Sequence, residues 1–510
     1  MNNIKRIFLT GISMLLCGVA FAQGHEDLLR FSQYNYSFGT ARSSAMGGAF
    51  SSLGADYSSV VMNPAGLGMY RRSEISISPA LTVNYADVDN ATDIGSFSKN
   101  TGRTQFALNN FGGAFNVYTG TGAVTSFTFG FGYNKLADFN TKTNVQGRSA
   151  SSMIDYFGYK VADSGFTPPP GGGGINVFPN NVNIWDGALA YNTFLLEYDQ
   201  GGWFVDNLFD MNQAVLSSSF NQLTKGSVGQ YDISGGINFL NLVYFGVGIG
   251  VQDIYYRQTN TYTETPENNA AYRLNNFRYI QNLKQDGSAW NVKVGAIIRP
   301  IEDLRFSVAF HTPTYIRLDE YYSADMYSYF NDGNAYYDGV EYLNSNSYQL
   351  RTPSRLLAGL SYTINAGRSP LGVISFDYER VWYNNMRMFR SGWDIEDFDV
   401  TDEVNAIYKP ADNFRVGAEV VLSPQAFLRL GYAFYGSMYE NSNLDKYGKS
   451  SNYSGGFGYR WDDFGLDIAY VYMRKKSLPA NVFYYEGLTS GTYNTKNNRH
   501  NLVLTASYRF

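Results

Sequence analysis

Cysteine and histidine are nearly absent from this sequence of 510 residues. It contains one cysteine, Cys17, and three histidines, His25, His311 and His500. A single cysteine excludes an internal disulfide, and the histidine spacing matches no metal-binding motif. We therefore expect no metal site and no cofactor.

Charge and long apolar runs are also scarce. Only 16% of the residues are charged, and the formal net charge of −5 gives no reason to expect nucleic-acid binding. After the N-terminal region no stretch of 18 consecutive apolar residues occurs, so no transmembrane helix is predicted. Tyr (43), Phe (36) and Gly (52) are abundant, which favours pleated strands and crowded turns.

Residues 1–22 are typical of a secretory signal peptide. Lys5 and Arg6 supply the positive charge, residues 7–19 are apolar, and Ala20-Phe21-Ala22 is a small-residue cleavage site. We expect cleavage after residue 22, which would remove the cysteine and export the mature chain.

The main pattern after residue 72 is alternation of apolar and polar side chains. Residues 243–252, for example, alternate Val, Phe, Val, Ile and Val with Tyr, Gly, Gly, Gly and Gln. Such alternation separates two faces of a strand, as in a barrel that contacts lipid outside and a lumen inside. The predicted fold is an all-β, transmembrane antiparallel β-barrel of about 14 strands, with segments at 73–85, 104–118, 123–139, 229–239, 243–256, 288–299, 304–318, 354–364, 371–383, 412–422, 426–437, 452–461, 464–474 and 500–510. The second segment changes phase near Asn109-Asn110, which predicts a β-bulge.

The connections between these segments alternate strictly between short and long, and the largest is 140–228. Outer-membrane barrels have short periplasmic turns and long extracellular loops, and an even strand number puts both chain ends in the periplasm. The alternative is a soluble all-β sandwich or propeller, which has no reason to sort its loops in this way. The chain ends on an aromatic residue, Phe510, which resembles the signal that the barrel-assembly machinery reads.

The domains predicted are the signal peptide (1–22), an N-terminal hatch (23–72) and the barrel (73–510). A segment as small as 23–72 cannot bury a core alone, and the barrel lumen is the nearest surface on which it can pack. The alternative is a periplasmic extension or a flexible tail.

The hatch sequence resembles the N-terminal hatch of the FadL/TodX family of outer-membrane channels for fatty acids and other hydrophobic compounds. The resemblance rests on Ala41-Arg42-Ser43-Ser44-Ala45-Met46-Gly47-Gly48-Ala49-Phe50, Leu53-Gly54-Ala55-Asp56 and Asn63-Pro64-Ala65-Gly66-Leu67. It implies that a ligand enters a groove among the outer loops, moves to a lumen site beside the hatch and leaves sideways near a kinked strand. Gly130 and Gly132 are candidates for that kink.

The candidate site residues fall into two groups. The hatch residues are Gly47, Gly48, Asn63, Pro64, Ala65 and Gly66. The candidate ligand-binding residues are Phe31, Tyr34, Phe38, Phe50, Met62, Trp185, Leu189, Leu195, Phe204 and Leu208. The last five belong to an outer loop in which Ile184, Ala188, Tyr191, Leu195 and Tyr198 share one predicted helical face.

Charged residues also face the predicted lumen. Their near balance argues against an ion-selective pore and favours ion pairs with one another or with the hatch. The residues are Lys293, Arg305, Arg355, Arg415, Arg429, Asp377, Glu379, Glu419 and Asp467.

The predicted function is passive uptake of fatty-acid-like or aromatic molecules by a monomer in the outer membrane of a Gram-negative bacterium. The expected partners are outer-membrane lipid, a hydrophobic ligand and the barrel-assembly machinery. One alternative is a secretion-associated shuttle of the same fold. A lower alternative is a barrel lipid hydrolase using His311. The sequence does not separate fatty acid, aromatic hydrocarbon and haem as ligands.

Overall fold

The computed structural model describes residues 25–34, 39–90, 96–97, 99–149, 151–168, 185–199, 202–204, 215–267, 272–341, 346–367, 369–390, 396–485 and 488–510. The predicted signal peptide therefore lies outside the described residues. No helix among the residues described is long and apolar enough to span a membrane.

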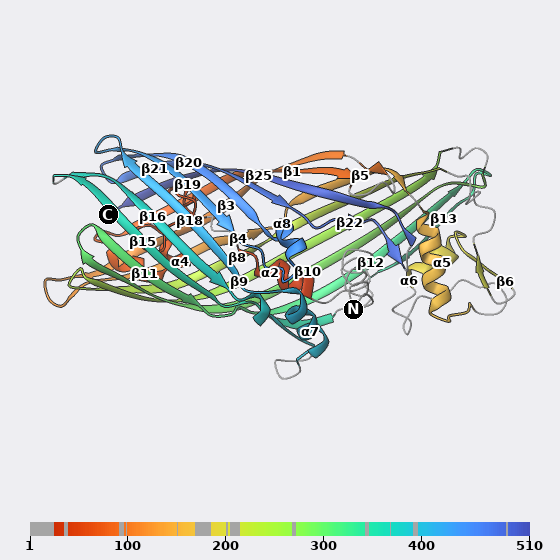
Figure 1. Ribbon diagram of the computed structural model, residues 1–510, viewed down its shortest axis with the longest axis horizontal. Coiled ribbons are helices and arrows are strands. Elements are labelled where there is room, and N and C mark those ends of the chain that lie inside the picture. The colour runs from red at the N-terminus through yellow and green to blue at the C-terminus, as the bar shows by residue number, and fades with distance from the viewer. Residues whose placement is uncertain are drawn as a thin grey trace.

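Fourteen strands form a closed antiparallel barrel (Figure 1). Each pairs with its neighbour along the chain, and the last pairs with the first, so that Ile75 lies opposite Tyr508. All fourteen predicted segments are confirmed. They are β1 (Glu74–Asn90), β3 (Lys99–Thr119), β4 (Val124–Asp138), β8 (Leu216–Phe239), β9 (Val243–Pro266), β10 (Leu274–Ile301), β11 (Leu304–His311), β15 (Arg355–Ala366), β16 (Ser369–Val381), β18 (Ala411–Val421), β19 (Ala426–Tyr435), β20 (Ser450–Trp461), β21 (Phe464–Lys476) and β25 (Thr492–Arg509).

The outer wall carries the apolar band that the alternation predicts. On β9, Val247, Ile249 and Val251 are each 53% exposed, whereas the intervening Gly248 and Gly250 are buried. Exposed side chains this apolar would be unfavourable in water, and their continuity around the ring matches the hydrocarbon region of a bilayer. The wall therefore defines an integral outer-membrane β-barrel.

The bulge predicted near Asn109 is confirmed. In the pairing of β1 with β3, Ser78 lies opposite Asn110 and Pro79 opposite Leu108, so Asn109 is the extra residue.

Three predicted loops proved to contain long strand extensions. β8 and β9 have 24 residues each and β10 has 28, and the wall continues in β5 (Thr141–Ser149), β12 (Tyr315–Phe330), β13 (Ala335–Val340) and β14 (Asn346–Arg351). The predicted loop 140–228 was therefore too wide, as were the connections left between the predicted segments 243–256 and 288–299 and between 304–318 and 354–364. Above the lipid band the partly exposed positions of β9 include Thr259, Thr261 and Thr263, so the strand continues where its apolar alternation has ended.

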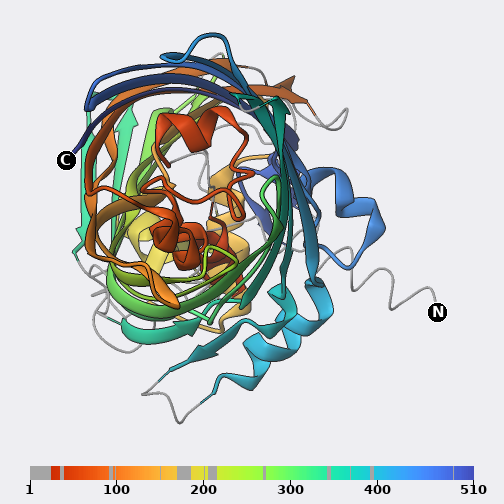
Figure 2. The same ribbon diagram turned by 90° about the vertical axis from the view of Figure 1, so that its left-hand side faces the viewer.

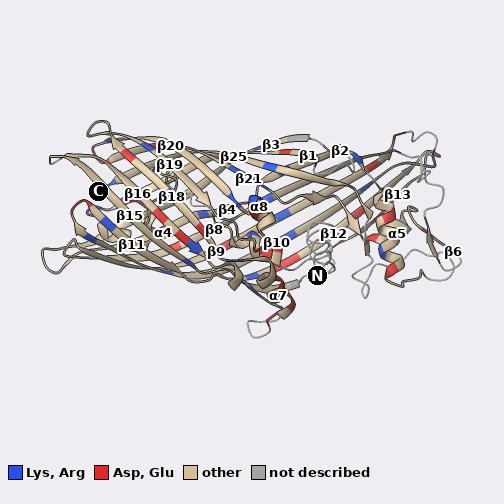
Figure 3. Ribbon diagram, viewed as in Figure 1, with Lys and Arg blue, Asp and Glu red and all other residues tan. Residues whose placement is uncertain are grey.

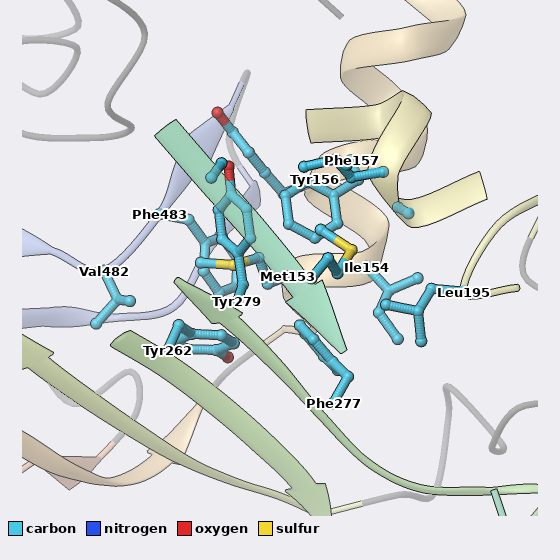
Figure 4. Packing of buried hydrophobic residues seen from close by; sticks show 14 of the residues in the cluster. Met153, Ile154, Tyr156, Phe157, Leu195, Tyr262, Phe277, Tyr279, Val482 and Phe483 are labelled. Carbon is cyan, nitrogen blue, oxygen red and sulfur yellow. The ribbon is translucent and has the colours of Figure 1, made fainter. Parts of the chain in front are cut away.

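A compact loop cap fills the long-loop end of the barrel. We use this name for α5 (Met153–Asp163), α6 (Trp185–Asn192), β6 (Glu197–Asp199), β7 (Gly202–Phe204), β23 (Tyr484–Tyr485) and β24 (Leu488–Thr489), with the strand ends beneath them. Its core is aromatic (Figure 4). The predicted single helix through Leu195 and Tyr198 was wrong, because α6 ends at Asn192 and Phe194 adopts a positive φ of 58°.

The remaining elements outside the barrel ring are short. They are β2 (Ser96–Phe97), η4 (Tyr383–Asn385), β17 (Arg387–Phe389), α7 (Phe398–Ile407), η5 (Ser442–Leu444), α8 (Asp445–Gly448) and β22 (Ala480–Asn481).

The N-terminal residues form an interior segment, which we define as the described residues before Ser73. Its helices α2 (His25–Ser32), α3 (Ala41–Ala45), α4 (Ser59–Met62) and η2 (Pro64–Met69) lie inside the ring of strands (Figure 2). The backbones of Ser73 and Phe510 are hydrogen-bonded at 3.0 Å at the short-turn end. His25 lies farther along the lumen, where its Nδ1 is 2.9 Å from the hydroxyl of Tyr408, just before β18.

Candidate functional site

Glycines in the barrel wall allow the backbone of the interior segment to approach very closely. A Cβ atom added at Gly246 would lie 2.2 Å from the nitrogen of Ala65, and one at Gly431 would lie 2.1 Å from the nitrogen of Gly47. Real Cβ atoms do not come so near to a backbone, so these wall positions require glycine. Gly47 and Gly48 themselves have positive φ angles of 66° and 75°.

The Asn63-Pro64-Ala65-Gly66 stretch turns the chain into η2. The side-chain oxygen of Asn63 accepts from the amide of Ala65 at 3.1 Å, which caps η2, and Pro64 occupies its first position. The side-chain nitrogen of Asn63 donates to the carbonyl of Ser51 at 2.9 Å. These four residues therefore form a tight turn that packs against β8, β9 and β10.

An ion-pair chain joins the interior segment to the wall. Arg42 of α3 donates through Nε and Nη2 to the two carboxylate oxygens of Glu419, both at 3.0 Å. Glu419 also accepts from Arg429 at 2.5 Å, and Arg429 continues to Asp467 at 2.6 Å. Figure 3 shows such acidic and basic positions distributed along the barrel.

A second polar contact holds the turn after α3. Asp377 of β16 accepts from the amides of Phe50 and Ser51, both at 3.0 Å, and from the hydroxyl of Ser51 at 2.7 Å. Beside it, Arg415 donates to Glu379 at 2.9 Å.

The prediction that lumen charges pair with each other or with the hatch is confirmed for eight of the nine charged residues given in the sequence analysis. The exception is Arg305, which forms no ion pair with the described residues.

A small enclosed cavity of about 20 Å³ lies between the interior segment and the wall. It is roughly the size of one water molecule. Its lining combines two cations with polar and apolar groups: Tyr34, Val61, Leu136, Gln230, Asn291, Lys293, His311, Thr312, Thr314, Pro353 and Arg355.

Most polar groups of this cavity have protein partners, but the side-chain oxygen of Asn291 has none among the described residues. Lys293 pairs with Asp232 at 2.6 Å, and the Arg355 guanidinium lies 4.4 Å from the centre of the Tyr34 ring. The Tyr34 hydroxyl is 3.2 Å from the hydroxyl of Thr314. His311 Nε2 lies 3.0 Å from the carbonyl oxygen of Met62, so this histidine contacts backbone of the interior segment.

The β-ladder is interrupted close to the bulge. Pairing between β3 and β4 ends at Asn110 opposite Asn134, although both strands continue beyond those residues. The side-chain oxygen and nitrogen of Asn109 and the side-chain nitrogen of Asn110 are buried without a hydrogen-bond partner among the described residues. Buried polar groups are rarely left unpaired, so this part of the wall is a candidate site for function.

Tyr57 of the interior segment lies behind this interruption. A Cβ at Gly132 would lie 2.4 Å from the Tyr57 hydroxyl, which accepts from Asn134 at 3.3 Å. Gly132, one of the two kink candidates, therefore lies two residues from the end of the ladder. Gly130, the other candidate, packs against Val60 and Leu67.

The candidate ligand-binding residues fall in three separate places. Only Tyr34 lines the cavity, and Phe31, Phe50 and Met62 are buried between the interior segment and the wall. Trp185, Leu189 and Leu195 belong to the core of the loop cap, and Phe204 is 39% exposed. Phe38 and Leu208 lie outside the described residues.

Sequence reasoning missed Tyr57, Gln230 and Asn291 as parts of this site. Asn291 shares its strand face with Lys293, so alternation could have placed it in the lumen. Nothing in the sequence singles out Tyr57 among the many tyrosines.

The closed ring, its apolar outer band and the segment inside it define an outer-membrane β-barrel with a filled lumen. The chain has the fold of the FadL/TodX-type channels, as the resemblance in its N-terminal motifs implied. The crystal structure of the P. putida toluene transporter TodX aligns with a TM-score of 0.52 at 12% identity, over 92% of this chain and 98% of that chain. The CymD monoaromatic hydrocarbon channel aligns with a TM-score of 0.51 at 11% identity, over 94% of this chain and 99% of that chain. No family model matches the sequence, and no curated protein matches it.

Proposed function

We propose that this protein is a channel for passive uptake of hydrophobic small molecules, fatty-acid-like or aromatic, across an outer membrane. The observation that carries the proposal is the coincidence of three features in one lumen: the cavity beside Tyr34, the interrupted β3–β4 ladder and Tyr57 behind it. The shared fold supports it, since TodX is a toluene transporter and CymD a monoaromatic hydrocarbon channel.

In this proposal residues 23–72 act as the hatch, and the long-loop end faces outward. A ligand first contacts the loop cap and then reaches the cavity from the long-loop end of the barrel. It then leaves through the wall at Asn109 and Asn110, without an energy source. Because a cavity of about 20 Å³ is far smaller than any such ligand, the interior segment must move before the ligand can pass.

The experiment locks the interior segment to the wall. The hydroxyl oxygens of Ser51 and Ser307 are 2.9 Å apart, so the double variant Ser51→Cys/Ser307→Cys brings two thiols within disulfide range. The labelled probes are toluene and palmitate, and the readout is their uptake into vesicles containing the full chain. We expect oxidation to reduce uptake about tenfold or more, and reduction of the disulfide to restore it.

The matched control joins two strands that are already paired. Thr141 and Thr224 lie opposite each other on β5 and β8 with their hydroxyl oxygens 2.5 Å apart. Oxidation of Thr141→Cys/Thr224→Cys should leave uptake unchanged. Equal uptake by the oxidised and reduced Ser51→Cys/Ser307→Cys variant would show that the interior segment need not move, and the proposal would fail.

A further inference from the structure

A second hollow lies on the outside of the barrel, where β19, β20, β21, β25 and β1 run side by side. This groove has a volume of about 830 Å³. Aromatic rings surround it, and one glycine forms its floor: Tyr85, Tyr453, Tyr470, Tyr472, His500 and Gly455. It is separate from the lumen cavity, with which it shares no lining residue.

Gly455 leaves space in the groove, although the packing of the barrel wall does not require a glycine at this position. A Cβ added there would meet only Leu430 at 3.4 Å and the carbonyl of Arg429 at 3.6 Å, which are ordinary contacts. At the wall glycines Gly246 and Gly431, in contrast, an added Cβ would lie less than 2.3 Å from a backbone atom. A larger side chain at position 455 would therefore fill the groove while the barrel keeps its fold.

The polar edge of the groove is held in place by its own hydrogen bonds. The Tyr470 hydroxyl is 2.6 Å from Nδ1 of His500, and Tyr472 donates to Asn498 at 3.1 Å. The Tyr85 ring meets the His500 ring edge-on at 5.7 Å. These contacts order the aromatic rim, so a ligand would meet a preformed surface.

The groove crosses the boundary of the apolar band. Leu430, Ile468 and Leu502 are exposed on the band side, whereas Asp87 and Asn498 lie toward the long-loop end. Tyrosines gather at the interface between hydrocarbon and headgroups. A molecule in the groove would therefore have its apolar part in the membrane and its polar part at the surface.

Two cations lie just beyond the rim. Tyr472 is opposite His500 in the pairing of β21 with β25; the next outward-facing position on β21 is Arg474, and the one after is Lys476. Both are exposed, and neither forms an ion pair within the described part of the chain. Lys496, opposite Lys476, is paired with Asp89 at 2.7 Å. Arg474 and Lys476 are therefore available to a phosphate at the height of lipid headgroups.

We propose that the groove binds one phosphate-bearing membrane lipid, with an acyl chain over Gly455 and its phosphate at Arg474 and Lys476. The aromatic rim packs on the glycerol region between them. This site does not depend on the proposed uptake function, because it is outside the wall and its ligand comes from the surrounding bilayer.

The test is native mass spectrometry of the full chain in neutral detergent with added phosphatidylglycerol, or with diacylglycerol of the same acyl chains. We expect one phosphatidylglycerol to be retained per barrel. The fraction of barrels that retain diacylglycerol should be lower by about tenfold or more. Gly455→Leu should abolish retention. The matched control is Gly235→Leu, because Gly235 also faces outward with room for a Cβ, 3.6 Å from the Phe127 ring.

Charge is tested separately. Arg474→Gln/Lys476→Gln should lower phosphatidylglycerol retention to the diacylglycerol level, whereas Lys142→Gln/Lys225→Gln, which removes two exposed cations of β5 and β8, should not. Equal retention by the Gly455→Leu and Gly235→Leu variants would overturn the site. Equal retention of both lipids would overturn the phosphate contact. A dimer that Gly455→Leu dissociates would assign the groove to a second copy of the chain and also overturn the proposal.

Discussion

The interior segment and the loop cap both fill the lumen, but different forces hold them. Besides buried apolar side chains such as Phe50, the interior segment meets the wall through ion pairs, hydrogen bonds and close contacts with glycine, as between Arg42 and Glu419. The loop cap meets it through aromatic burial, as between Trp185 and Tyr322, whose ring centres are 5.0 Å apart. Polar partners can be exchanged for other polar partners, whereas buried apolar area is lost when it separates. If the proposed uptake requires part of the lumen to move, we expect that part to be the interior segment.

The largest effect is expected in the loop cap. Trp185→Ala removes a side chain that is 1% exposed and should destabilise the cap by about 3–5 kcal/mol. Hydrogen exchange of α5 and α6 should become fast while that of the barrel strands stays slow. Phe204→Ala, at a residue 39% exposed, is the control and should change little. If both variants exchanged alike, the cap would lack the apolar core described above.

The next effect concerns the ion pair between the interior segment and the wall. Glu419→Gln leaves Arg42 and Arg429 without their shared carboxylate and should weaken attachment of α3 by about 3 kcal/mol. Hydrogen exchange of residues 39–50 and the conductance of single channels should both increase. Arg148→Gln breaks an exposed pair with Glu267 and should cost no more than about 1 kcal/mol. Unchanged conductance in Glu419→Gln would show that this ion pair does not hold the segment closed.

The smallest effect is a pH dependence confined to α2. Burial raises the pKa of Glu26 from 4.5 to about 7. Ionisation of Glu26 therefore opposes docking, by which we mean the packing of α2 inside the barrel, and docking weakens as the pH rises from 4.5 through 7. Burial lowers the pKa of His25 from 6.5 to about 4, so protonation opposes docking as the pH falls from 6.5 through 4. Glu26→Gln should remove the first dependence and keep the second. The measurement is hydrogen exchange of residues 25–34 from pH 4 to pH 7, corrected for intrinsic exchange rates. If exchange in Glu26→Gln still became faster between pH 4.5 and 7, as in the unsubstituted protein, the assignment to Glu26 would be contradicted.

The barrel was predictable because lipid imposes a regular pattern on the sequence. Val247, Ile249 and Val251 face hydrocarbon, so their alternation identifies a strand without knowledge of its neighbours. The phase change at Asn109 revealed the bulge for the same reason. Lumen charges such as Arg429 could be assigned to the inner face by parity alone.

The strand extensions and the cavity could not be predicted in this way. Above the bilayer water replaces lipid, so outward residues such as Thr259 no longer differ in polarity from inward ones such as Asn260. The cavity joins Tyr34 with residues of β10 and β11 more than 250 positions away, and only the folded ring brings them together. Helix α6 ends through the positive φ of Phe194, a conformation that phenylalanine rarely adopts.

The 28 residues of β10 have a consequence for the proposed uptake. At roughly 3.3 Å per residue and a tilt of about 40°, such a strand rises about 70 Å, and the hydrocarbon layer accounts for only about 25 Å. The barrel therefore extends well beyond the hydrocarbon layer at its long-loop end. With the long-loop end outward, as proposed, the capped end would lie in the surrounding medium, and a ligand that enters there would come from solution rather than from the bilayer.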